Sequence, residues 1–292
     1  ADVRHRSERA AVSLLGRKSD LGEERIAMLL PAELSYVTTM HGIWLAGGIA
    51  VPLNVGSSTA ELEHYLGNAG VTRLVTNDEF AGPVADLCRS LGIDILLTPE
   101  LEGATPVELP EVGLARRAMI IFTSGTTSKP KGVVSTHGNI AAQVTCLLDA
   151  WQWSEDDRIP LPLPLHHVHG IINILSCALW AGATVHMHRG FDAGRLVADV
   201  AEDRYTLFMA VPTIYAKLIE YLGTLPEDEA TRAKRGFGAM RLNVSGSAAC
   251  PVTLFERWQV LTGQVLLERY GMTEPGMALS NPYARQRRAG HA

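Results

Sequence analysis

Short apolar runs alternate with longer segments of helical periodicity along almost the whole chain, and this alternation limits the possible folds more than any other feature. The strand-like runs are 25–31, 49–53, 74–76, 93–97, 119–122, 159–162, 184–188, 207–210, 241–245 and 265–267. The helix-like segments are 33–46, 59–69, 83–91, 137–149, 171–180, 195–202, 212–222 and 251–261. Alternation of this kind predicts an α/β protein in which helices cover mainly parallel sheets.

The length and the charge balance exclude some classes of function. A chain of 292 residues can bury a large core, roughly three quarters of its unfolded surface, in one domain or two. Its 26 basic and 31 acidic residues give a net charge of −5, which argues against a nucleic-acid or membrane-surface partner. The one sharp basic cluster, Arg285, Arg287 and Arg288, is better explained by a solvated loop than by phosphate contacts.

The cysteines, the first residues of the sequence and its longest apolar stretch indicate the cellular compartment of the protein. Cys88, Cys146, Cys177 and Cys250 are widely spaced without a C-x-x-C pair, so we interpret them as buried thiols in a reducing compartment. The sequence starts with polar and charged residues, so we expect no signal peptide, and the apolar stretch 171–187 is interrupted by polar residues and glycine. We therefore expect a location in the bacterial cytoplasm or the mitochondrial matrix rather than secretion.

The loop TSGTTSKPKG, residues 123–132, follows the apolar run 119–122 and is the strongest single motif. Small residues let the backbone approach an anion closely, and hydroxyls and a lysine add donors and charge. This composition predicts phosphate binding. It differs from the Walker loop, which needs a glycine-lysine pair before Ser or Thr and a helix directly after. A flexible turn between two strands is the alternative, because turns favour the same residues.

Four further motifs follow the loop in a fixed order. They are LPLPLHHVHG (161–170), VPTIY (211–215), VSGSAA (244–249) and ERYGMTE (268–274). Together with the loop, they resemble the adenylate-forming superfamily of acyl- and aryl-CoA synthetases, luciferases and nonribosomal adenylation domains, from about residue 26 to 291. HHVHG with ERYGMTE is most similar to the malonyl-CoA and methylmalonyl-CoA synthetases.

The resemblance implies an α/β fold of two lobes, each a mainly parallel sheet covered by helices. Residues 23–156 would carry the phosphate loop, and residues 157–292 with 1–22 would carry the acid and adenine sites. The family continues into a C-terminal domain with a ribose-binding aspartate and a catalytic lysine. We therefore expect residues 1–292 to be a truncated N-terminal adenylate-binding domain that is poorly active alone.

The resemblance also implies a role for each matched residue. The phosphate cradle comprises Thr123, Ser124, Gly125, Thr126, Thr127 and Lys131, with Ser128 where the family usually has glycine. The adenosine block comprises Tyr270, Gly271, Met272 and Thr273, and the adenine-side turn comprises Ser245, Gly246, Ser247 and Ala248. Glu274 would hold Mg²⁺, because a carboxylate beside a triphosphate needs a cation between them. The catalytic set would be Thr126, Lys131, His167, Thr273 and Glu274, with His167 as a gate residue.

Arg269 indicates the substrate class. A buried arginine is costly without an anion, and a second carboxylate on the substrate would provide one. We expect His169 to be a second donor, and Val211 and Met272 to line the acid pocket. An internal salt bridge from Arg269 to Glu268 or another acid is the alternative.

The expected activity is ATP-dependent conversion of malonate or methylmalonate to an acyl-adenylate, followed by transfer to coenzyme A. Its ligands would be ATP, Mg²⁺, coenzyme A and the acid, with no nucleic acid and no membrane. A ligase for another short acid, such as succinate or acetate, and a non-catalytic nucleotide-binding module are the alternatives. His166, His167 and His169 invite a zinc hypothesis, but no cysteine or carboxylate lies nearby in sequence.

Overall fold

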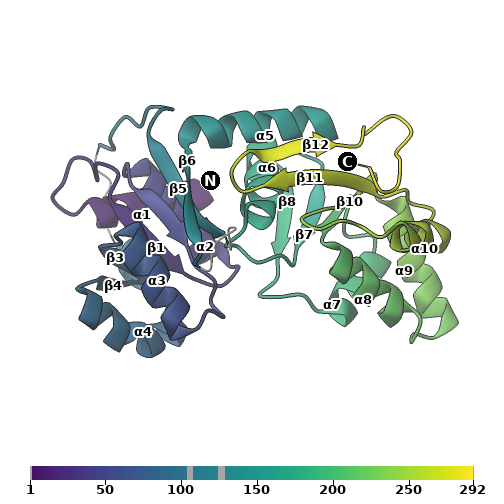
Figure 1. The fold of residues 1–292 in the computed structure, drawn as a ribbon, viewed down its shortest axis with the longest axis horizontal. Helices are drawn as coiled ribbons and strands as arrows, with labels where there is room; N and C mark the ends of the chain where they lie inside the picture. The colour runs from purple at the N-terminus through teal and green to yellow at the C-terminus, as the bar shows by residue number, and fades with distance from the viewer. Residues whose placement is uncertain (1, 104–107, 124–128, 292) are drawn as a thin grey trace. The chain divides into compact units, whose positions relative to one another are not determined.

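The computed structural model describes residues 2–103, 108–123 and 129–291, and the chain divides into two units. Unit 1 comprises residues 1–141 with 165–167, and unit 2 comprises residues 142–164 with 168–292. Each unit contains its own β-strands, paired into sheets, and its own helices (Figure 1). We had expected residues 1–22 to belong with the second lobe, but the N-terminal helix packs inside unit 1.

Unit 1 is built on a six-stranded sheet in the order β4-β3-β1-β2-β5-β6. The pairings are parallel, except that β5 and β6 are antiparallel. The strands are β1 (Arg25–Leu29), β2 (Ile49–Pro52), β3 (Arg73–Thr76), β4 (Asp94–Leu97), β5 (Arg117–Thr123) and β6 (Lys131–Thr136). The helices are α1 (Asp2–Leu15), α2 (Leu34–Leu45), α3 (Thr59–Ala69), α4 (Asp78–Leu91), the 3₁₀ helix η1 (Thr98–Glu102) and α5 (His137–Trp151), whose second part lies in unit 2.

Local signals explain where these helices begin and end. The Ser58 side chain accepts from the Glu61 amide while the Glu61 carboxylate accepts from the Ser58 amide, a capping box that starts α3. Gly70 ends the same helix in the left-handed conformation, at φ 61°. The α4 helix begins at Asp78, capped by Asn77, and not at residue 83 as the sequence suggested, so it carries a proline in its interior.

The core of unit 1 lies between the sheet and its helices. Helix α1 packs on α2, and α3 packs on α4. The strands contribute fully buried apolar side chains, and the helices α3 and α4 contribute Leu62, Leu66, Val84 and Cys88. Cys88, Cys177 and Cys250 are buried as predicted, whereas Cys146 is exposed on α5. All four thiols are free.

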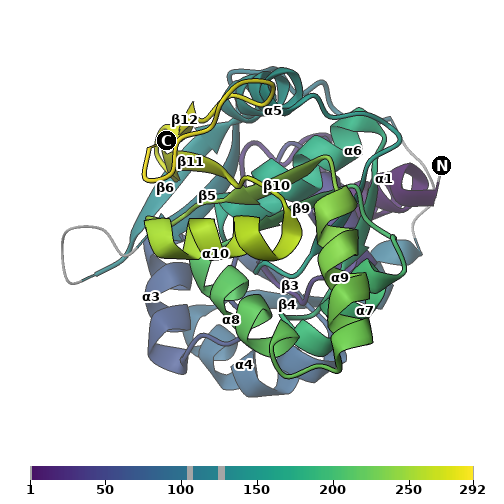
Figure 2. The same ribbon diagram turned by 90° about the vertical axis from the view of Figure 1, so that its right-hand side faces the viewer.

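Unit 2 contains a four-stranded sheet in the order β12-β11-β10-β9 and a two-stranded sheet of β7 and β8. The strands are β7 (Arg158–Leu161), β8 (Thr184–Met187), β9 (Leu207–Ala210), β10 (Leu242–Ser245), β11 (Leu267–Met272) and β12 (Gly276–Ser280). The helices are the π-helix η2 (His169–Ser176), α6 (Cys177–Ala181), α7 (Ala193–Ala201), α8 (Pro212–Leu222), α9 (Glu227–Ala239) and α10 (Val252–Thr262). Helices α8 to α10 cover one face of the four-stranded sheet (Figure 2).

Four buried aromatic rings join this sheet to its helices. Phe208 on β9 lies 5.3 Å from Tyr215 and 5.6 Å from Phe237, between ring centroids. The Trp258 ring on α10 lies 4.8 Å from Tyr215 and 4.9 Å from Phe237. The Tyr215 hydroxyl donates to the Val244 carbonyl at 2.9 Å, so the buried phenol is satisfied. This cluster holds the β9–α8 and β10–α10 connections rigidly in place.

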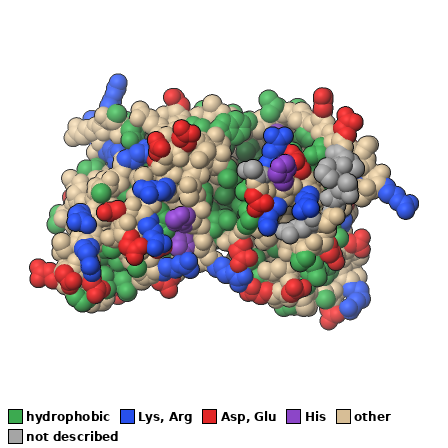
Figure 3. Space-filling view, turned by 180° about the vertical axis from the view of Figure 1, so that it is seen from behind, with side chains coloured by type: hydrophobic (Ala, Val, Ile, Leu, Met, Phe, Trp, Pro, Cys, Tyr) green, Lys and Arg blue, Asp and Glu red, His purple; other side chains and the backbone are tan. Residues whose placement is uncertain are grey.

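The surface carries both signs of charge, in keeping with the net charge of −5. On the face shown in Figure 3, basic and acidic side chains are interspersed. Within the described ranges, no helix is both long enough and apolar enough to cross a bilayer.

Candidate functional site

The carboxyl ends of three parallel strands bring the predicted acid and adenine motifs to one edge of the unit 2 sheet. Val211 directly follows β9, and Gly246 directly follows β10. Ligands of open α/β sheets bind at this edge. We had expected the ERYGMTE motif to follow a strand at 265–267. Instead, its first five residues form most of β11 itself. Arg269 is thus a residue of strand β11, which pairs with β10 on one side and β12 on the other.

Arg269 is buried, with 5% of its surface exposed, and forms no ion pair with any acid in the described ranges. Its Nη2 donates to the Ser247 hydroxyl at 3.1 Å, while its Nε is buried without a hydrogen-bond partner. Burial lowers the pKa of Arg269 to about 10, so the guanidinium stays charged at neutral pH. The neighbouring Glu268 instead accepts from the Gly290 amide at 2.6 Å. The alternative of an internal salt bridge between Arg269 and Glu268 is therefore not observed in the described residues.

Gly246 and Ser247 shape the surface on which Arg269 lies. A Cβ at Gly246 would overlap Nε, Cδ and Cζ of Arg269, so glycine is required for the guanidinium to pack against this backbone. Ser247 adopts the left-handed conformation, at φ 68°, which non-glycine residues rarely adopt. The Ser247 hydroxyl also lies 3.1 Å from Nδ1 of the buried His169, at the start of η2. Ser247, predicted for the adenine side, therefore contacts both predicted acid-binding residues.

The β11–β12 hairpin presents the predicted adenosine block. Tyr270 is 51% exposed and Met272 is 47% exposed, two residues apart on one face of β11. Leu279 is the direct partner of Tyr270 on β12 and is 55% exposed, so it extends the same apolar surface. Gly271 is needed because β12 approaches it closely at the Gly276 carbonyl. Sequence reasoning did not single out Leu279, whose position depends on a strand pairing.

Hydrogen bonds attach the β11–β12 hairpin to helix α5. The turn of the hairpin contains Glu274, the predicted metal ligand. The Gln143 side-chain oxygen accepts from the Met277 amide at 2.5 Å, and the Trp151 indole donates to the Ser280 hydroxyl at 3.1 Å. Thr273 lies in the turn between the two strands with Glu274. Glu274 is exposed and has no ion pair with any residue that the structure describes, so its carboxylate is available to a cation.

The predicted phosphate loop belongs to unit 1. Thr123 ends β5 and pairs in register with Lys131, the exposed first residue of β6. The other cradle residues, Ser124, Gly125, Thr126 and Thr127, lie outside the described residues with Ser128. Their role in phosphate binding stays a prediction.

His166 and His167 also belong to unit 1, with ring centroids 4.1 Å apart. Burial, together with the neighbouring His167, lowers the pKa of His166 to about 4, and burial lowers the pKa of His167. Both imidazoles are therefore neutral at physiological pH. Within the described ranges, no three His, Cys, Asp or Glu side chains gather in the way that metal ligands do.

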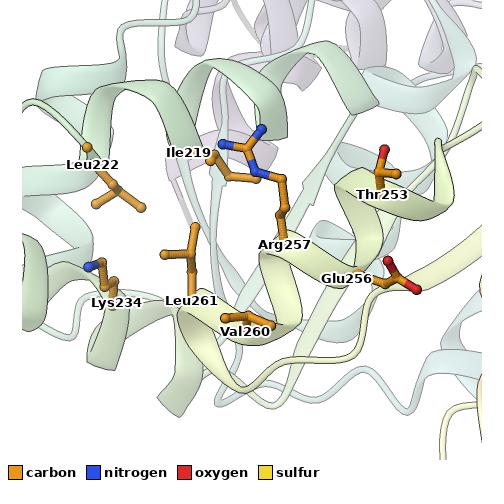
Figure 4. A pocket seen from close by; sticks show the side chains of 9 residues that line it. Ile219, Leu222, Lys234, Thr253, Glu256, Arg257, Val260 and Leu261 are labelled. Atoms are coloured by element: carbon orange, nitrogen blue, oxygen red, sulfur yellow. The ribbon is translucent and has the colours of Figure 1, made fainter.

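A separate groove lies at the far end of α8, between α8, α9 and α10 (Figure 4). Ile219, Leu222 and Leu261 form its apolar floor, and Arg257 and Lys234 line it from α10 and α9. Its volume is about 630 Å³. Val211, which is predicted to bind the acid, lies at the other end of α8, so this groove is distinct from the predicted acid site.

Comparison with known proteins identifies relatives of the whole chain. The profile of the family of AMP-binding enzymes matches residues 1–292. The mitochondrial malonate–CoA ligase ACSF3 of Mus musculus is 44% identical over 281 residues, which cover 92% of this chain and 48% of that protein. The chain spans about half the length of the curated relatives it matches.

Two solved structures are similar in fold over nearly all of the chain. The ATP-bound MatB of Rhodopseudomonas palustris has a TM-score of 0.89 and 29% identity, covering 99% of this chain and 57% of that one. A malonyl-CoA ligase bound to methylmalonyl-CoA and AMP has a TM-score of 0.83 and 32% identity, covering 96% of this chain and 58% of that one. The expected two-lobed α/β fold of such ligases is confirmed.

Proposed function

This chain belongs to the family of AMP-binding enzymes, and we propose that its parent protein activates malonate or methylmalonate with ATP and transfers the acyl group to coenzyme A. The acid would first become an acyl-adenylate with release of pyrophosphate. The thiol of coenzyme A would then displace AMP. Relatives bound to ATP, and to methylmalonyl-CoA with AMP, support this choice of ligands.

The burial of Arg269 is the observation on which we base the proposed substrate class. A guanidinium with no acidic partner among the described residues and an unpaired buried Nε is a costly arrangement, unless an anion binds there. The distal carboxylate of a dicarboxylic acid supplies that anion, with two oxygens that suit the planar guanidinium. His169, held beside Arg269 through Ser247, would be the second donor. We also assign Val211 and Met272 to this pocket, although Met272 lies with Tyr270 on the exposed face of β11.

The nucleotide would use the exposed surface of the β11–β12 hairpin. We assign adenine stacking to Tyr270, with the backbone of Gly246 to Ala248 on its other side. Thr273 would donate to the α-phosphate, and Glu274 would hold the Mg²⁺ that neutralises phosphate charge. The exposed carboxylate of Glu274, without a basic partner in the described ranges, suits that cation. Unit 1 would bind the β- and γ-phosphates through Thr123 to Thr127 and Lys131, and His167 would gate the acyl-adenylate.

A substrate panel tests the proposal directly. Acid-dependent exchange of pyrophosphate into ATP is measured in the parent protein with malonate, methylmalonate, succinate and acetate. We expect malonate or methylmalonate to give the highest kcat/KM. Equal rates with acetate would exclude the dicarboxylate assignment. Malonate and methylmalonate differ by one methyl group, worth only about 1–3 kcal/mol, so the panel also measures that preference.

Lys131→Ala should slow this exchange by about 10- to 100-fold, because a charge-assisted hydrogen bond contributes about 1.5–3 kcal/mol. Lys131 is exposed at the start of an outer strand, so the variant should keep its fold, and circular dichroism checks this. Lys129→Ala is the matched control, because it removes a neighbouring positive charge outside the predicted cradle. Unchanged exchange in Lys131→Ala would show that the loop does not bind the phosphates.

A further inference from the structure

One hydroxyl group contacts both donors of the proposed acid site. The Ser247 Oγ lies 3.1 Å from Arg269 Nη2 and 3.1 Å from His169 Nδ1. Arg269 and His169 are 5% and 3% exposed, and they come from strand β11 and helix η2. Segments one hundred residues apart in sequence are thus joined through a single side chain.

The donors and acceptors of the three side chains allow a continuous chain of hydrogen bonds from Arg269 through Ser247 to His169. A guanidinium has donors only, so Arg269 donates to the Ser247 oxygen. Accepting from a cation polarises the hydroxyl and makes its own hydrogen a stronger donor. That hydrogen can be donated to Nδ1 of His169, which then acts as the acceptor. In a neutral imidazole that accepts at Nδ1, the proton is on Nε2.

The backbone at this position supports a role for the hydroxyl. Ser247 has φ 68°, a conformation that glycine adopts without strain and serine does not. A side chain at position 246 would overlap the Arg269 guanidinium. Because residue 246 is glycine, Arg269 can pack against this backbone, beside the Ser247 hydroxyl. A strained residue whose side chain contacts two buried polar groups indicates a functional constraint.

We propose that Ser247 is a positioning residue for recognition of the dicarboxylic acid, because it anchors Arg269 and holds His169 with its proton on Nε2. His169 and Arg269 then both present N–H donors to the distal carboxylate. This inference rests on the proposed function. It moves Ser247 from the adenine side of the site to the acid side.

The tautomer of His169 is measured by long-range ¹H–¹⁵N NMR on the parent protein labelled at histidine, with the His169 signals assigned by their loss in His169→Gln. We expect a protonated Nε2 and an unprotonated Nδ1 in the parent. Ser247→Gly removes the hydroxyl and suits the backbone, so it should keep the melting temperature but give a mixture of tautomers. Ser280→Ala, which removes a hydroxyl from β12, should leave the tautomer unchanged.

The acid preference gives a second measurement. Ser247→Gly should lower kcat/KM for malonate about 10-fold while changing that for propionate much less. A parent His169 protonated on Nδ1, or a Ser247→Gly variant with the parental tautomer and the parental malonate-to-propionate ratio, would overturn the proposal. Failure of the proposed function would appear separately, as an absence of malonate-dependent exchange in the parent while the tautomer is as expected.

Discussion

Arg269→Met should lower kcat/KM for malonate by at least about 10-fold and lower that for propionate much less. The lost charge-assisted hydrogen bonds contribute about 1.5–3 kcal/mol each, and a stranded substrate carboxylate could cost about 2–5 kcal/mol. Propionate has no second charge to strand. Pyrophosphate exchange in the parent protein, with both acids at several concentrations, gives the two ratios.

The stability of the same variant separates a functional arginine from a structural one. Arg269 is buried, without an acidic partner in the described ranges, and burial lowers its pKa to about 10. Methionine fills a similar volume without a charge, so the melting temperature should stay the same or rise. Arg285→Met, at an exposed position, is the control. Equal losses for malonate and propionate with a lower melting temperature would make Arg269 a structural residue.

The elements that the sequence predicted best are those with strong local signals. The helix at 59–69 was predicted with its observed bounds, and the Ser58–Glu61 capping box explains why. Pro212 at the first helical position likewise sets the start of α8 after the apolar strand β9. Helix α9 was missed because its sequence has little apolar periodicity, and only small residues and Phe237 face the core. The edge strands β6 and β12 were missed because they are half-exposed and depend on their partners.

The helix expected at 171–180 shows another limit of local reasoning. Its first part is the π-helix η2, in which the Ser176 hydroxyl donates to the Ile171 carbonyl five residues earlier, at 2.8 Å. Apolar periodicity does not distinguish this winding from an α-helix. Because η2 begins at His169, the winding also helps to determine where that imidazole lies.

The candidate site was predicted in its residue types but not in its contacts. Arg269 and His169 were expected to act on the same acid, and the structure joins them through Ser247. Ser247 was expected on the adenine side because the family motif is read as one block. Its left-handed backbone and its two partners depend on the packing of β10, β11 and η2, which are distant in sequence. Long-range contacts of this kind carry no local sequence signal.

Asp157→Ala should destabilise the protein by about 3–5 kcal/mol, because it leaves the Arg241 charge without its partner. Asp157 is 2% exposed, and Arg241 binds both its oxygens, at 2.8 and 2.6 Å. Arg241 also donates to the Trp151 carbonyl at 2.9 Å, and the Thr206 hydroxyl donates to Asp157 at 2.8 Å. The ion pair therefore joins the end of α5 to β7, β9 and β10. Thermal unfolding should show a melting temperature lower by about 10 °C.

The pH dependence of this contribution follows from the direction of the pKa shift. Burial alone would raise the pKa of Asp157, but hydrogen bonds from Arg241, Ser154 and Thr206 and the Arg241 charge lower it overall. A lowered folded-state pKa gives stability that is present above the unfolded value of about 4 and is lost as the pH falls through the folded value. The parent should therefore lose stability in acid faster than Asp157→Asn, which does not titrate there. Asp156→Ala, an exposed neighbour, should change the melting temperature little, and a similar loss in both alanine variants would exclude the buried ion pair as the cause.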